Sequence, residues 1–207
     1  MQKSLFDIKE IENKARMEIY KPKGRAVWTK PNSDAKIGLA MQKVDSAIGK
    51  IAMGKTIHFA TMGEWSSHEL LFHILDQTGP ADVWISTWSV SEDAARLLIG
   101  KVETKAITRL NCLFDWRIKV RRPEVFQLVR YKIADIRLTT CHAKVTVVEN
   151  DSWKVAVVGS ANYTNNPRIE AGVIACDEKA ADFHRKWIKD EIENSDPFDT
   201  KKRRANG

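Results

Sequence analysis

Hydrophobic positions along the chain follow two alternating periods. Short runs rich in β-branched and aromatic residues, typical of buried strands, stand at 56–62, 83–90 and 106–115. Runs with apolar residues three and four positions apart, typical of amphipathic helices, stand at 36–51, 66–75, 91–102 and 122–133. Strands that alternate with helices predict an α/β layered domain.

The rhythm changes after residue 133. Three consecutive strand patterns follow, at 136–148, 153–161 and 168–176, and the turn-forming "ENDS" joins the first two. A last helical pattern spans 178–194. We therefore expect one α/β domain over residues 35–194, a mixed β-sheet flanked by helices on both faces. Residues 1–34 combine charged and turn-forming residues, which predicts an N-terminal extension or arm, and the basic residues 195–207 predict a disordered tail.

Composition adds a charge preference to this picture. The chain has 207 residues, of which 43% are hydrophobic, enough for one domain with a substantial core. Its net charge of +7 favours a polyanionic partner, nucleic acid first and an anionic membrane second, although a basic protein needs no such partner to be soluble.

Cysteine usage and hydropathy suggest a compartment. Cys112, Cys141 and Cys176 lie in apolar strand patterns without CxxC spacing, which predicts buried thiols, no disulfides and a reducing environment. No stretch approaches the roughly 20 apolar residues of a membrane span. We expect a soluble, cytoplasmic protein with no membrane partner.

Three motifs match known sites in letters but not in context. "GKIAMGKT" (49–56) has the spacing of a phosphate-binding loop, but a helix pattern precedes it and a strand follows, so we interpret it as a turn. His68 and His73 are five positions apart and project about 140° from each other on a helix, which does not suit one metal ion. "HRKWIKDE" (184–191) has H-x-K spacing on a helix, where residues two apart point in different directions. We expect no cofactor and no metal.

Two other polar pairs do fall on strand patterns. His142 and Lys144 stand two apart, as do Ser160 and Asn162, and residues i and i+2 of a strand share a face. In a hairpin, a three-residue loop would place His142 opposite Ser160, and a two-residue turn would offset them by one. Either register brings an imidazole, an ammonium group, a hydroxyl and a carboxamide to one end of a sheet, a set that suits a phosphate.

This pattern, H-x-K followed by G-S-x-N, resembles the signature of the phospholipase D superfamily. "GSANYTNNPRIEAG" (159–172) extends the resemblance and contains Glu170. The resemblance covers most of the domain and implies the family's α/β/α sandwich. Glu149 stands where the family has an aspartate and the hairpin is longer than usual, so Asp151 in the turn is the alternative equivalent.

The resemblance also implies a mechanism. In this family one histidine attacks phosphorus to form a phosphohistidine and a second protonates the leaving oxygen, without a metal. The chain has one suitable H-x-K, so the resemblance implies a homodimer whose two-fold axis brings both copies of His142 to one phosphate. It further implies that Glu170 accepts a hydrogen bond from His142.

A basic segment indicates the substrate. "DWRIKVRR" (115–122) gathers four basic side chains with Trp116, as a phosphate-backbone track requires, although a solvated charged loop has the same composition. The four are Arg117, Lys119, Arg121 and Arg122. We expect a nuclease that acts on DNA or RNA; the alternatives are a catalytically silent nucleic-acid-binding dimer and a lipid phosphodiesterase.

Overall fold

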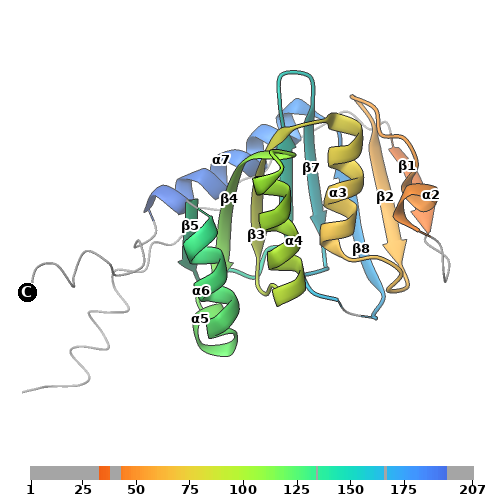
Figure 1. Ribbon diagram of the computed structural model, residues 1–207. Coiled ribbons are helices and arrows are strands. Elements are labelled where there is room, and N and C mark those ends of the chain that lie inside the picture. Colours follow the sequence, from red (N-terminus) through yellow and green to blue (C-terminus); the bar gives the residue numbers. More distant parts are fainter. Residues whose placement is uncertain (1–32, 38–42, 134, 166, 195–207) are drawn as a thin grey trace, which may run out of the picture.

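One mixed eight-stranded sheet organises the protein (Figure 1). The computed structural model describes residues 33–37, 43–133, 135–165 and 167–194. The strands are β1 (Ser33–Ile37), β2 (Thr56–Thr61), β3 (Ala81–Thr87), β4 (Ile107–Asp115), β5 (Asp135–Thr139), β6 (Val145–Glu149), β7 (Lys154–Gly159) and β8 (Glu170–Ala175). The described helices are α2 (Val44–Ile48), α3 (Ser67–Thr78), α4 (Glu92–Glu103), α5 (Ile118–Arg121), α6 (Pro123–Lys132) and α7 (Glu178–Asn194).

The strand order and directions bring the ends or starts of several strands to one edge of the sheet. Across the sheet the order is β1-β2-β8-β7-β6-β3-β4-β5. Strands β3, β4 and β5 are parallel to one another, and β1 is parallel to β2. The neighbouring pairs β2–β8, β8–β7, β7–β6 and β6–β3 are antiparallel. Strands β2, β3, β4, β5 and β7 therefore end, and β6 and β8 begin, at the edge drawn lowest in Figure 1, called the lower edge below.

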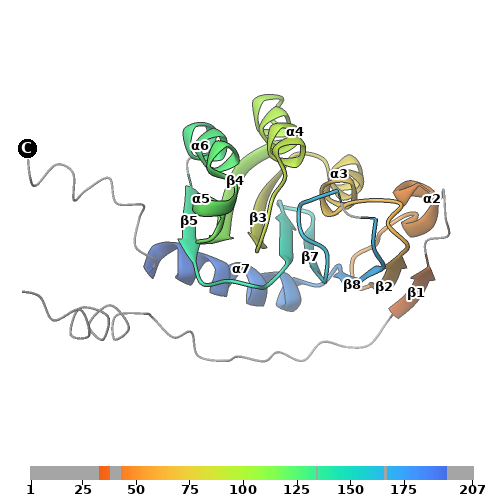
Figure 2. The same ribbon diagram turned by 90° about the horizontal axis from the view of Figure 1, so that it is seen from below.

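Helices cover both faces of the sheet, which confirms the predicted fold class. Figure 2 shows α2 to α6 on one face and α7 on the other. The larger core cluster lies under α2 to α6 and includes Ile74, Leu98 and Phe114. A second cluster packs the apolar side of α7, with Ile188 and Ile192, against Trp84 and Leu113 of the sheet.

Capping residues and a proline stabilise the starts of helices α3, α4 and α6, close to where the sequence predicts them. Ser66 and Glu69 form a reciprocal capping box at the start of α3. Ser91 caps α4 by accepting from the Ala94 N–H, and Pro123 occupies the first turn of α6. Helix α2 ends at Gly49 and strand β2 begins at Thr56, so the order around 49–56 is the reverse of a phosphate-binding loop.

Two predicted elements were wrong. Lys36 and Ile37 belong to β1, paired with β2, and the helix expected at 36–51 spans only Val44–Ile48 among the described residues. The single strand expected at 136–148 is two strands, β5 and β6. Strand β5 lies outside β4, whereas β6 pairs with β3, so residues 140–144 have to cross the ends of β4 and β3 before the chain reverses. No proline or glycine marks this crossing, which is why the sequence does not reveal it.

The ends of the chain are only partly described. Residues 33 and 34 lie in β1; the rest of the expected extension 1–34 and the expected tail 195–207 lie outside the described residues. None of the described helices has the length and hydropathy to cross a membrane. All three cysteines are buried thiols, as expected.

Candidate active site

The segment 140–144, which crosses the strand ends, carries His142 to the lower edge. Two contacts attach it to the neighbouring strands β4 and β3: the Cys141 N–H donates to the Asp115 carboxylate at the end of β4 (3.1 Å), and the Cys141 Sγ lies 3.0 Å from the Ser86 Oγ on β3. The His142 side chain is exposed. The imidazole is thus held at a defined place and remains open to a ligand.

The β6–β7 hairpin has the two-residue turn, the second of the two registers open to the sequence. Val145 pairs with Val158, and the Asn150 N–H donates to the Trp153 carbonyl across the turn. The Asn150 carboxamide accepts from the N–H groups of Ser152 and Trp153, which stabilises this tight turn. Lys144 therefore lies opposite Gly159, whose N–H donates to the Lys144 carbonyl at 3.1 Å, and His142 is offset by one from Ser160.

Lys144 lies directly against His142. Its Nζ is 3.1 Å from the imidazole nitrogens and donates to the His142 carbonyl at 2.8 Å. Partial burial lowers the pKa of Lys144, and the charges of Cys141 and Glu170 act in the opposite direction. The ammonium group is partly desolvated beside an exposed imidazole, an arrangement suited to an anion that touches both.

Ser160 and Glu170 form a second polar pair at the same edge. The Ser160 hydroxyl donates to the Glu170 carboxylate and accepts from the Ala171 N–H at 3.0 Å. Glu170 thus binds Ser160, and the described contacts contain no hydrogen bond between Glu170 and His142, contrary to the expectation. The topology explains this, because β7 separates β8, which begins at Glu170, from β6.

Asn162 lies on the other side of the site, next to the end of β3. Its Oδ1 accepts from the Thr87 Oγ1 at 3.2 Å. The following residue, Tyr163, is buried, and its hydroxyl is 2.6 Å from the Thr146 Oγ1. This buried contact anchors the loop, so His142, Lys144, Ser160 and Asn162 are all held at the lower edge, as the sequence predicts.

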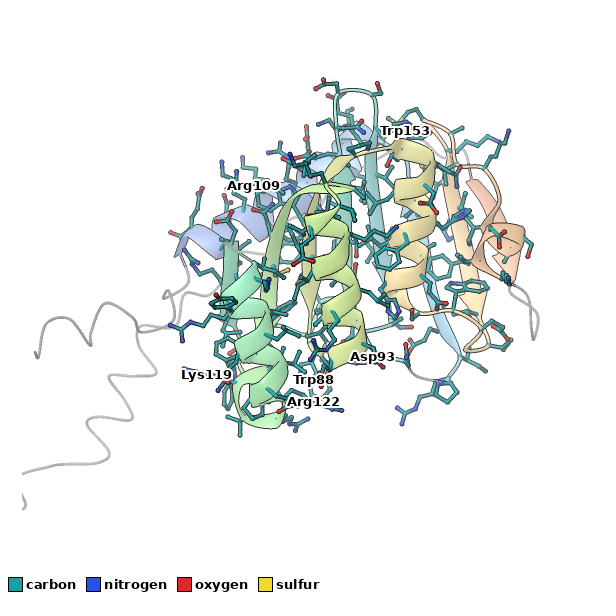
Figure 3. All side chains as sticks on the ribbon, in the orientation of Figure 1. Trp88, Asp93, Arg109, Lys119, Arg122 and Trp153 are labelled. Carbon is teal, nitrogen blue, oxygen red and sulfur yellow. The ribbon has the colours of Figure 1, made fainter. Side chains whose placement is uncertain are left out.

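The basic segment adjoins the site through a tryptophan. Helix α5 follows β4, and Figure 3 shows Trp88, Lys119 and Arg122 in the lower part of the molecule. The guanidinium groups of Arg117 and Arg121 lie 5.5 and 5.0 Å from the centre of the Trp88 ring. The Trp88 ring meets the His142 ring edge to face at 5.9 Å. Trp88 thus connects the basic segment to the candidate nucleophile.

Sequence reasoning missed Trp88 and Asp115. Both follow or end parallel strands, at the edge where α/β sheets commonly bind ligands, and this position was the available signal. Asp115 is fully buried and accepts from the Arg117 Nε at 2.7 Å as well as from the Cys141 N–H. Since Arg117 pairs with this carboxylate, much of its charge is already balanced.

Of the four remaining histidines, His58 is exposed on β2 and the other three have contacts elsewhere. His68 is buried beside the Ser66 hydroxyl, with Nδ1 at 2.8 Å, and burial lowers its pKa. His73 Nε2 contacts the Gly49 carbonyl at 2.9 Å, and His184 Nδ1 accepts from Trp187. Among the described residues no group of three His, Cys, Asp or Glu side chains could hold a metal ion.

The two acidic residues of the hairpin lie far from His142. Glu149, at the other end of β6, pairs with Lys154 and Arg185, each at 3.2 Å, and accepts from the Trp84 indole. It therefore ties the hairpin to α7. Asp151 lies in the turn at the same distant end. Neither carboxylate reaches the site edge in this chain.

A small cavity lies beside Lys144, between α3 and the sheet. It offers about 30 Å³ of solvent space, and its lining is mainly apolar, with Lys144, Ser66 and Ser67 at its polar side. This space suits one or two water molecules. A ligand much larger than water does not fit this cavity, and the exposed lower edge is the surface open to it.

Known structures share this fold. The phospholipase D family member Nuc from Salmonella typhimurium is 18% identical, with a TM-score of 0.53 over 68% of this chain and 95% of Nuc. NucT from Helicobacter pylori is 16% identical, with a TM-score of 0.50 over 62% of this chain and 90% of NucT. No family model and no curated protein sequence matches the chain.

Polyphosphate kinase from Porphyromonas gingivalis also contains the fold. It is 12% identical, with a TM-score of 0.50, and the match covers 71% of this chain but 27% of the kinase. The chain therefore has the phospholipase D fold. Since one fold supports several reactions, the function has to be argued from the site.

Proposed function

We propose that the protein is a phosphodiesterase of the phospholipase D type that cleaves nucleic acid through a phosphohistidine, as a homodimer and without a metal. The observation that carries this proposal is the gathering of His142, Lys144, Ser160 and Asn162 at one exposed edge, with the Lys144 ammonium 3.1 Å from the imidazole. The fold shared with Nuc supports it.

In the first step one nitrogen of His142 attacks phosphorus. The P–N bond forms as the bond from phosphorus to the leaving oxygen breaks, and a second imidazole gives its proton to that oxygen. In the second step this imidazole takes a proton from water, the hydroxide attacks phosphorus, and the P–N bond breaks. Free His142 is restored and no other reactant is consumed.

The neighbouring polar groups stabilise the phosphate. Lys144 offsets its negative charge, and the Asn162 carboxamide donates to a non-bridging oxygen. Ser160 is held by Glu170, so Glu170 acts as a positioning residue through Ser160. This assignment replaces the direct contact with His142 that the resemblance implied.

The second imidazole comes from a second copy of the chain. Attack and protonation take place on opposite sides of phosphorus, and the described chain places one histidine, His142, exposed at the lower edge. An isologous dimer brings the partner subunit's His142 to the same phosphate. The exposure of His142 in a single chain is consistent with a site that a second copy completes.

Charge favours nucleic acid as the substrate. The chain carries +7 at pH 7, and Lys119, Arg121 and Arg122 lie exposed on the α5 side of the site. A basic track beside a phosphodiester site is suited to a polymeric phosphate backbone.

Substitution of His142 tests the proposal. His142→Ala should lower hydrolysis of labelled DNA or RNA by about 10³-fold or more, because the nucleophile is removed, while EDTA should leave the wild-type rate unchanged. The matched control is His58→Ala, at an exposed position of β2. Equal rates for His142→Ala and wild type, or loss on chelation that magnesium restores, would contradict the proposal.

A further inference from the structure

A row of alternating aromatic and guanidinium groups leads away from His142. The Trp88 ring lies 5.9 Å from His142, the Arg117 guanidinium 5.5 Å from Trp88, and the Trp116 ring 6.0 Å from Arg117. Arg121 adds a second guanidinium 5.0 Å from Trp88. Trp116, at the outer end, is 49% exposed, so its ring is available to a ligand.

The chain holds the centre of this row in place. Asp115, fully buried, accepts from the backbone N–H and the guanidinium of Arg117. The Trp116 N–H donates to the Thr139 carbonyl at 2.9 Å, which ties the start of the segment to β5. A row fixed before the ligand arrives loses little conformational entropy on binding.

The alternation matches the chemistry of a single nucleic-acid strand. Indole rings stack on nucleobases of any sequence, and a guanidinium group such as that of Arg121 binds a phosphate between them. Arg117, paired with Asp115, contributes mainly its flat guanidinium face beside the two rings. A duplex hides its base faces inside the stack, whereas unpaired bases offer them. The flat exposed ring of Trp116 would serve no purpose for a phosphate alone.

We infer that Trp116, Arg117, Trp88 and Arg121 form a subsite for unpaired nucleobases beside the scissile phosphate, so that the protein prefers single strands to duplex. The inference rests on the proposed function only for the position of that phosphate at His142.

Binding without cleavage tests the subsite, in a His142→Ala background. The probes are fluorescein-labelled oligothymidylate of about 16 nucleotides, an abasic oligomer with the same number of phosphates, and a duplex of equal length. The protein should bind oligothymidylate about tenfold or more tighter than the abasic oligomer, because each stacked base adds affinity. Trp116→Ala should reduce that difference severalfold and leave abasic binding unchanged.

Tyr131→Ala is the matched control. Tyr131 is 86% exposed and lies near the Lys132 ammonium (6.0 Å), but at the far end of α6. It should keep the full preference for oligothymidylate. Equal weakening of both single-stranded probes by Trp116→Ala, no effect of that substitution, or tighter binding of the duplex would overturn the inference.

A second assay separates this inference from the proposed function. Hydrolysis of bis(p-nitrophenyl) phosphate, measured with His142 intact, requires the chemistry but no base of a polymer. Absence of hydrolysis together with a Trp116-dependent preference for bases would refute the proposed function and support the subsite. Normal hydrolysis without that preference would support the proposed function and refute the subsite.

Discussion

Asp115 shows how one side chain joins segments that the sequence keeps apart. Its carboxylate contacts Arg117 two residues later and the Cys141 N–H, 26 positions along the chain and next to His142. Motif spacing predicted that His142, Lys144, Ser160 and Asn162 share one edge, because these residues lie close in sequence to the start of β6 and the end of β7, which are adjacent strands. Spacing did not reveal Asp115 or Trp88, because their contacts with Cys141 and His142 join segments that are distant in sequence.

Asp115→Ala should destabilise the fold. It leaves the Arg117 guanidinium and the Cys141 N–H without their buried acceptor, so the free energy of unfolding should fall by about 3–5 kcal/mol, measured by urea denaturation. The control is Asp135→Ala, which breaks the more exposed pair with Arg109 and should cost less than about 1 kcal/mol. Similar losses for the two variants would show that Asp115 is no special anchor.

At the scale of elements, local signals worked and tertiary constraints did not. The starts of α3 and α4 were predictable because a capping residue acts within its own turn. The division of 136–148 into β5 and β6 was not predictable, because it depends on tertiary pairing. Strand β5 pairs with β4 and β6 pairs with β3, on opposite sides of the β3–β4 pair. The hairpin register depends on the length of the turn, and the sequence allowed either two or three residues there.

The start of α3 predicts a pH effect. Burial lowers the pKa of His68 below its usual value of about 6.5, although Glu69 and Asp93 partly oppose this shift. Between the lowered pKa and 6.5 the unfolded chain binds the proton more readily, so stability should fall as pH drops below about 6.5.

His68→Asn should reduce this loss, measured as the difference in unfolding free energy between about pH 7.5 and about pH 5.5. Burial also lowers the pKa of His184. Part of the acid-induced loss of stability should therefore remain in the single variant, and adding His184→Asn should reduce it again. An unchanged pH dependence in the double variant would contradict the assignment.

At the scale of the molecule, alternating periods were enough to predict a mixed sheet between helical layers. They were not enough to predict the strand order, because β2 pairs with β8, more than a hundred positions later. The lower edge exists only through such non-local pairing, since it brings together the ends of β3, β4 and β7 and the starts of β6 and β8. The same edge is where a second copy has to dock if two imidazoles are to meet one phosphate.

Mixing subunits tests that dimer. Inactive His142→Ala chains exchanged with wild type should form heterodimers that lack one required imidazole, so activity should fall faster than the wild-type fraction. With free exchange, an equal mixture should keep about a quarter of its dimers with both histidines, the random value for an isologous pair. Linear loss, or a monomer in sedimentation at the assay concentration, would show that each chain carries a complete site. The second acid would then be sought within one chain, first at His68, because the neighbouring Ser66 and Ser67 line the same cavity as Lys144.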